Sequence, residues 1–193
     1  MHRKIKIISS LFVLFAFFSC VTPRVTQICS RNLLDEGIKN ESQLAEFFLS
    51  HNPDYDKAKI KRMAAIYIEE SRMENINSDV AFVQMCLETG FLKFGNLVTP
   101  EMNNFCGLGA ISPEQPGETF PDVRTGIRAH IQHLQAYATP ADVSLHNPLV
   151  DPRYSWPHKA KNAKTVFDLA GSWATDKEYG NKLDGLLSEL EEF

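Results

Sequence analysis

One glutamate at the end of an apolar segment is well placed to do acid–base chemistry. Glu88 follows the apolar residues Val80, Val83 and Leu87 and precedes the glycine-punctuated stretch Thr89-Gly90-Phe91-Leu92-Lys93-Phe94-Gly95. A carboxyl group at the end of a buried helix is partly removed from water, which raises its pKa, and it can still reach into a cleft. Glu88 is therefore a candidate proton donor.

Two further motifs follow Glu88 along the chain. Asn104 and Phe105 belong to the stretch Asn103-Asn104-Phe105-Cys106-Gly107-Leu108-Gly109-Ala110, whose glycines permit close approach of the backbone to a ligand. Trp173 and Tyr179 belong to the stretch Trp173-Ala174-Thr175-Asp176-Lys177-Glu178-Tyr179. A tyrosine offers a sugar both an apolar ring face and a hydroxyl group. Trp173 is either a packing residue or part of a sugar-binding surface.

These motifs occur in the order found in the bacterial glucosaminidase family, glycoside hydrolase family 73, and Ala129-His130 matches a helix of that family. Over residues 40–193 the chain resembles this family. The resemblance implies a mostly α, lysozyme-like helical domain with a reduced or absent β-lobe. It also implies an endo-β-N-acetylglucosaminidase that cleaves the β-1,4 bond after N-acetylglucosamine in peptidoglycan, without a cofactor. The functional residues that it suggests are Glu88 as general acid, Tyr179 at the reacting sugar, and Asn104 and Phe105 at the cleft floor.

Other assignments stay open at this stage. Phe91 is either a sugar-contacting residue or a core residue. Glycosidases commonly use a second carboxylate, which family members place in a hairpin-like lobe, here reduced to residues 111–121. Glu114, Glu118 and Asp122 are the candidates, and Glu118 is preferred because it approaches Phe120, where the chain returns to the core. The alternative is that all three are solvated and that held water or the acetamido group of the substrate takes this role.

The N-terminus carries the features of an export signal. Arg3, Lys4 and Lys6 precede an apolar stretch over residues 7–18, which is too short for a comfortable membrane span. Ser19-Cys20 resembles the end of a lipoprotein signal, which predicts a signal over residues 1–19 and lipidation of Cys20. We expect a tether over residues 20–39, a catalytic domain over residues 40–193, and anchoring in the periplasm or at the cell surface. The alternative is an ordinary secreted or signal-anchored protein.

Apolar side chains at helical spacing predict a mostly helical domain. A first helix is expected over residues 41–50, and Asn77 or Ser78 is expected to cap the third. Strand-like alternation is nearly absent, so residues 111–121 are expected to form a loop or a very short hairpin. Four further helices are indicated by these apolar sets: Ile60, Met63, Ala64, Tyr67 and Ile68; Val80, Val83 and Leu87; Val123, Ile127, Ile131 and Leu134; Leu183, Leu186, Leu187 and Leu190.

The cysteines and histidines offer weaker alternatives. Cys86 and Cys106 either pair across the region of Glu88 or remain buried thiols, and no cysteine-protease signature surrounds them. His130 and His133 lie one helical turn apart, but no HExxH pattern is present. We therefore expect no metal site, even with His146 and His158 nearby in the sequence.

Charge excludes one class of partner. The 193 residues carry a formal net charge of -4, and a basic run at residues 57–62 is balanced by Glu69, Glu70 and Glu74. This is not the pattern of a nucleic-acid-binding protein. The expected partners are peptidoglycan strands and, through the lipid, a membrane, with the protein a monomer. Two alternatives to the glucosaminidase remain: a non-catalytic peptidoglycan-binding envelope lipoprotein, and a muramidase that cuts the alternate linkage.

Overall fold

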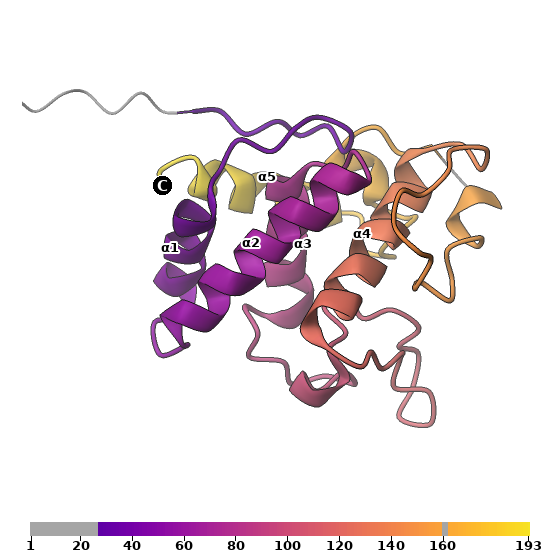
Figure 1. The fold of residues 1–193 in the computed structure, drawn as a ribbon, viewed down its shortest axis with the longest axis horizontal. Helices are drawn as coiled ribbons and strands as arrows, with labels where there is room; N and C mark the ends of the chain where they lie inside the picture. Colours follow the sequence, from indigo (N-terminus) through magenta and orange to yellow (C-terminus); the bar gives the residue numbers. More distant parts are fainter. Residues whose placement is uncertain (1–26, 160–161) are drawn as a thin grey trace, which may run out of the picture.

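The structure of the protein is a computed structural model that describes residues 27–159 and 162–193. Within these residues no β-sheet forms, and the elements are helices joined by loops (Figure 1). The prediction of a mostly α domain with a reduced or absent β-lobe is therefore confirmed. The predicted signal and Cys20 lie outside the described residues. The α-helices are α1 (Glu41–His51), α2 (Lys57–Met73), α3 (Ser78–Thr89), α4 (Val123–Ala138) and α5 (Tyr179–Leu190), and the short 3-10 helices are η1 (Pro100–Met102), η2 (Pro157–Lys159) and η3 (Val166–Leu169).

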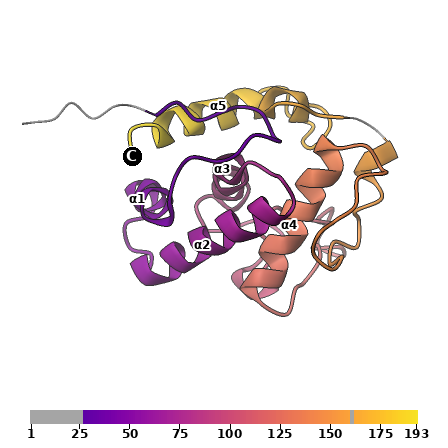
Figure 2. The same cartoon turned by 45° about the horizontal axis from the view of Figure 1, so that its top comes forward.

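Helix α3 lies at the centre of the domain, and the other four α-helices pack around it (Figure 2). Its residues are buried on nearly all sides, whereas its sequence suggested a single apolar face. Leu87 and Glu88 are the two residues of α3 that are not fully buried. The central helix thus reaches the surface only at its C-terminal end, where Glu88 lies.

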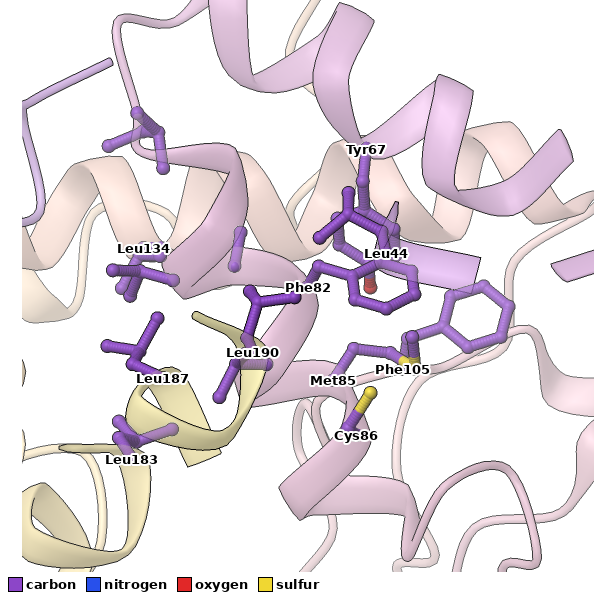
Figure 3. Close-up of a cluster of buried hydrophobic side chains, with 14 of the residues drawn as sticks. Leu44, Tyr67, Phe82, Met85, Cys86, Phe105, Leu134, Leu183, Leu187 and Leu190 are labelled. Atoms are coloured by element: carbon purple, nitrogen blue, oxygen red, sulfur yellow. The ribbon is translucent and has the colours of Figure 1, made fainter. Parts of the chain in front are cut away.

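The hydrophobic core is built on both sides of α3. Phe82 and Met85 of α3 belong to the same buried cluster as Leu44 of α1, Tyr67 of α2 and Leu187 of α5 (Figure 3). All five side chains are completely buried. Close packing of this kind holds the backbone of α3, and hence the position of Glu88, against the surrounding helices.

Each of the five predicted helices is present, and local signals explain where they begin. The Asn40 side chain accepts hydrogen bonds from the backbone of Ser42 and Gln43, and the Gln43 side chain completes a capping box on α1. Asn77 caps α3, as one of the two predicted alternatives, by accepting from the backbone of Asp79 and Val80.

The segment before α1 is part of the domain, which corrects the predicted tether over residues 20–39. From Cys29 onward the chain packs on the helices, and Cys29 and Leu33 are buried. The Arg31 guanidinium donates to Asp184 at 2.7 Å, and it also pairs with Glu191. Packing against the C-terminal helix, which is distant in the sequence, holds this segment on the domain. Local composition could not indicate such a contact.

The connections on either side of α4 surround the end of α3. Residues 111–121 form a loop with a single bridge between Ser112 and Gln115, in agreement with the predicted loop or very short hairpin. Helix α4 approaches the preceding loop so closely at Gly126 that a Cβ atom there would lie 1.8 Å from the carbonyl oxygen of Asn103. The absence of a side chain at Gly126 therefore lets the loop rest on α4.

Among the described residues, no helix has the length and apolar character needed to cross a membrane.

Candidate active site

Glu88 opens onto a cleft of about 440 Å³ at the end of α3. Gly90, with φ of 58°, caps the helix in the left-handed conformation and ends α3 directly after Thr89. Among the described residues, Glu88 is the only acidic one in the lining of the cleft, and no basic one lines it. The lining residues are Leu87, Glu88, Thr89, Gly90, Phe94, Asn96, Leu97, Val98, Asn104, Cys106, Gly107, Ala110, Trp173 and Ala174.

The two oxygens of the Glu88 carboxyl group have different surroundings. Oε1 accepts hydrogen bonds from the Tyr179 hydroxyl at 2.5 Å and from Trp173 Nε1 at 2.9 Å. Oε2 has no hydrogen-bond partner among the described residues, and Glu88 lines the cleft. A proton on Glu88 therefore resides on Oε2, because both neighbours of Oε1 are donors.

Burial raises the pKa of Glu88 above its ordinary value, and the hydrogen bonds from Tyr179 and Trp173 oppose this rise. Desolvation disfavours the carboxylate, whereas donors stabilise it. The net effect favours a protonated carboxyl group over a wider pH range than in a free glutamate. This is the property that a general acid requires.

A chain of hydrogen bonds runs from the core to Glu88. Gln84 Nε2 donates to the Tyr179 hydroxyl at 2.9 Å, and Gln84 Oε1 lies 3.0 Å from His130 Nε2. His130 Nδ1 in turn lies 3.0 Å from the Tyr67 hydroxyl. With the Gln84 oxygen as acceptor, His130 carries its proton on Nε2 and accepts from Tyr67 at Nδ1. In each of these hydrogen bonds, the acceptor is then the partner nearer to Glu88 along the chain of bonds.

The members of this chain are buried, and sequence reasoning missed two of them. Burial lowers the pKa of His130 to about 3, with a smaller contribution from His133, so its imidazole is neutral. Gln84 precedes Glu88 by one helical turn, which places both on the same side of α3. That spacing is the signal that could have identified Gln84. No local pattern distinguishes Tyr67 from an ordinary core residue.

Trp173 and Tyr179 both reach Glu88, as their common motif suggested. The Trp173 ring packs against His133 and Tyr137, with ring centroids 5.2 Å and 5.1 Å away, and lines the cleft. It is thus both a packing residue and a donor to the candidate acid. Tyr179 is 5% exposed and lies beneath Glu88, outside the cleft lining. Its position suits a role in holding the carboxyl group more than direct contact with a sugar.

Phe91 lies away from the cleft. Its ring stacks on His51 of α1 with centroids 4.1 Å apart, and Asn52 Nδ2 donates to its carbonyl oxygen at 2.9 Å. Phe91, Leu92 and Phe94 all have positive φ angles, which are uncommon for bulky residues. This left-handed turn packs on α1 through Phe91. Residues that follow it line one wall of the cleft.

Asn104 lines the cleft, but its amide is engaged within the protein. Asn104 Nδ2 donates to the carbonyl oxygens of Leu108 and Glu118 at 2.9 and 3.0 Å, and Oδ1 accepts from the Leu108 backbone at 2.9 Å. Asn104 therefore shapes the loop that forms the cleft floor. Phe105 lies below this floor, buried in the main core cluster.

The three candidates for the second carboxylate differ in their surroundings. Glu114 is exposed and accepts from the Ser112 hydroxyl, which lowers its pKa. Asp122 caps α4 by accepting from the Thr125 backbone at 2.8 Å, and this bond lowers its pKa. Glu118 is half-buried, and its Oε1 lies 3.2 Å from the position a Cβ atom would take at Gly109. It has no side-chain hydrogen bond among the described residues, and it does not line the cleft.

The cysteines and histidines take structural places. Cys86 and Cys106 are free, buried thiols, so the predicted alternative of a disulfide is not realised. Burial raises the pKa of both thiols well above the ordinary range, which suppresses the nucleophilic thiolate. His133 Nδ1 lies 2.8 Å from buried Asp151. In residues 27–159 and 162–193, no three side chains of the metal-binding types are grouped to hold an ion.

The helices packed around α3, the lack of a sheet among the described residues and the cleft at the end of α3 agree with the expected lysozyme-like helical domain. The chain belongs to the glucosaminidase family, because the family described as mannosyl-glycoprotein endo-beta-N-acetylglucosaminidase matches residues 64–192. An uncharacterised protein of Borreliella burgdorferi is 41% identical over 161 residues, which cover 83% of this chain and 78% of that protein. No solved structure matches the chain. The family that the motifs suggested is thereby confirmed.

Proposed function

We propose that the protein is a peptidoglycan hydrolase that cleaves the β-1,4 bond after N-acetylglucosamine, with Glu88 as the general acid. The observation that carries this proposal is the asymmetry of the Glu88 carboxyl group. One oxygen accepts from Tyr179 and Trp173, and the other is free to hold a proton at the cleft. The family membership supports a glycan substrate.

In this mechanism Glu88 Oε2 transfers its proton to the glycosidic oxygen as the bond to the sugar breaks and an oxocarbenium-like centre develops. The transfer leaves a negative charge on Glu88. Tyr179 and Trp173 are already directed at Oε1, so they stabilise this charge without rearranging. Gln84 positions Tyr179 by donating to the same hydroxyl oxygen that donates to Glu88.

Glu118 is proposed as the second carboxylate. Its half-buried side chain lies over Gly109, in the loop that contributes Gly107 and Ala110 to the cleft. Glu114 and Asp122 each have another hydrogen-bonding role. The acetamido group of the substrate is the alternative to Glu118 in the role of the second carboxylate.

We further propose that Cys20 carries a lipid anchor and that the domain works on the outer side of a membrane, where peptidoglycan lies. The support is the charged and apolar pattern of residues 1–19. Metabolic labelling with palmitate is expected to mark the wild-type protein and to miss Cys20→Ala. Labelling of both proteins, or of neither, would contradict the anchor.

Zymography on purified cell wall tests the hydrolase directly. The wild type is expected to clear the wall, and Glu88→Gln is expected to lose at least ~100-fold in activity, the usual contribution of a general acid. The glutamine keeps an acceptor for Tyr179 and Trp173, so circular dichroism should show an unchanged fold. Equal clearing by both proteins would refute the role of Glu88.

Two further measurements separate the alternatives. Co-sedimentation with insoluble wall, without clearing by the wild type, would favour the non-catalytic peptidoglycan-binding lipoprotein. Mass spectrometry of the released reducing ends identifies the bond that is cut. Reducing N-acetylglucosamine is expected, and reducing N-acetylmuramic acid would indicate a muramidase.

A further inference from the structure

A second hollow of about 150 Å³ adjoins the cleft that contains Glu88. Both are lined by the Cys106–Gly107 step, Ala110 and Trp173, so these residues form the ridge between them. The far side of the hollow is formed by Tyr137 and by a turn that contains Arg153 and Trp156. A chain molecule lying in the cleft can therefore continue over the ridge into this hollow.

The hollow differs from the cleft in charge. Arg153 is part of its lining, and among the described residues no acidic residue lines it. Within residues 27–159 and 162–193, the Arg153 guanidinium forms no salt bridge and no side-chain hydrogen bond. It lies 6.0 Å from the centre of the Trp156 ring, which is 53% exposed. An unpaired cation beside an exposed aromatic ring is suited to an anionic ligand with an apolar face.

The turn that carries these two side chains is tied to α4. Buried Asp151 accepts from the Arg153 backbone at 2.8 Å and lies 2.8 Å from His133 Nδ1. The Trp156 backbone donates to the Arg153 carbonyl oxygen at 2.9 Å. The Tyr154 hydroxyl donates to Gln135 Oε1 at 2.7 Å. These bonds hold the turn in place before a ligand arrives, which lowers the entropic cost of binding.

We propose that this hollow binds the acidic, peptide-bearing sugar of the glycan strand, with its ring against Trp156 and a carboxylate on Arg153. The proposal rests on the proposed function, because peptidoglycan alternates a neutral sugar with one that carries a lactyl-linked peptide. In the part of the chain that the structure describes, Glu88 is the only charged residue lining its cleft, which suits the neutral sugar. Arg153 then supplies the complementary charge one hollow away, and guanidinium groups bind carboxylates through paired hydrogen bonds.

Binding to the Glu88→Gln protein tests the site without turnover. N-acetylmuramoyl-L-alanyl-D-glutamate is the anionic probe, and N,N'-diacetylchitobiose is the neutral one, with affinities measured by titration calorimetry. Arg153→Gln is expected to weaken binding of the anionic probe by ~10-fold and to leave the neutral probe unchanged. Trp156→Ala is expected to weaken the anionic probe as well. Arg62→Gln, an exposed arginine on α2 that lines neither hollow, is the matched control.

The kinetic arm separates this proposal from the proposed function. On peptide-bearing strands, Arg153→Gln is expected to raise KM by ~10-fold at similar kcat, and Arg62→Gln should match the wild type. If the wild type clears no wall while Arg153→Gln still weakens the anionic probe, the hydrolase proposal fails and the binding site stands. If Arg153→Gln binds the anionic probe as tightly as Arg62→Gln does, the binding site is refuted whether or not the wall is cleared.

Discussion

The Tyr179 hydroxyl lies 2.5 Å from Glu88 Oε1, although 91 positions separate the two residues in the chain. Tyr179 is the first residue of α5, and Glu88 lies in the last turn of α3. The packing of α5 on α3 therefore places a donor that lowers the pKa of Glu88 against the larger, raising effect of burial. Glu88 in return raises the pKa of Tyr179, after the larger effect of burial, so the phenol remains a donor.

Tyr179→Phe is expected to move the alkaline limb of the kcat/KM profile to higher pH. The general acid must be protonated, so activity is lost as the pH rises through the pKa of Glu88. The hydrogen bond from Tyr179 lowers that pKa, and its removal raises the pKa further. The rate at the optimum should fall by ~10-fold or more, because the carboxylate formed in the reaction loses a donor. A pH–rate series checks both effects, with Tyr55→Phe as the control. An alkaline limb that stays in place or moves to lower pH would contradict this account.

Glu118→Gln is expected to lower kcat by ~100-fold if Glu118 is the second carboxylate. Glu114→Gln is the matched control, since Glu114 is exposed and bonds only to Ser112 in its own loop. Release of reducing sugar from purified wall measures both variants. Near-normal activity of Glu118→Gln would contradict this assignment and would indicate that the acetamido group of the substrate takes the role of the second carboxylate.

The wild type is expected to lose stability as the pH falls from about 6.5 toward 3, in part because of His130. Its pKa is lowered to about 3 in the folded protein, so the unfolded chain binds the proton first across this window. The loss attributable to His130 is at most ~3 kcal/mol at pH 4. His130→Gln should be less stable at pH 7 by ~1–3 kcal/mol, because buried partners lose hydrogen bonds.

Chemical denaturation at pH 7 and pH 4 measures this difference. Between pH 7 and pH 4, the free energy of unfolding should decrease less for His130→Gln than for the wild type. His146→Gln, at an exposed histidine, should retain most of the drop. Equal drops in the wild type and His130→Gln would show that His130 is not the titrating group.

Gly126→Ala is expected to destabilise the protein by ~2 kcal/mol or more, because the new methyl group meets the Asn103 carbonyl oxygen. Activity should fall as well, since the displaced loop forms the cleft floor. Gly185→Ala is the matched control: Gly185 lies on exposed α5 surface with open space around it. That variant should gain ~0.5–1 kcal/mol from helix propensity. Thermal unfolding of both variants checks the prediction, and an unchanged Tm for Gly126→Ala would refute the close contact.

Much of the fold could be predicted from the sequence, because helix formation and capping depend on residues that are close together in the chain. Helical spacing of apolar side chains identified each α-helix, and the cap of α3 could be narrowed to Asn77 or Ser78, since capping involves residues two or three positions apart. Glu88 could be recognised because it follows an apolar helix and precedes Gly90. These are local relationships, and short-range sterics and hydrogen bonding decide them.

The tertiary structure decided what surrounds Glu88. Gln84, His130 and Tyr67 come from three helices, and only the packing of those helices aligns their donors toward one carboxyl oxygen. Packing likewise placed Phe105 in the core and drew Cys29 and the residues after it onto α5. The sequence by itself determined the helices and the candidate acid, because those follow from local periodicity. The pKa of that acid depends on desolvation and on donors distant in the chain, which exist only once the helices have packed.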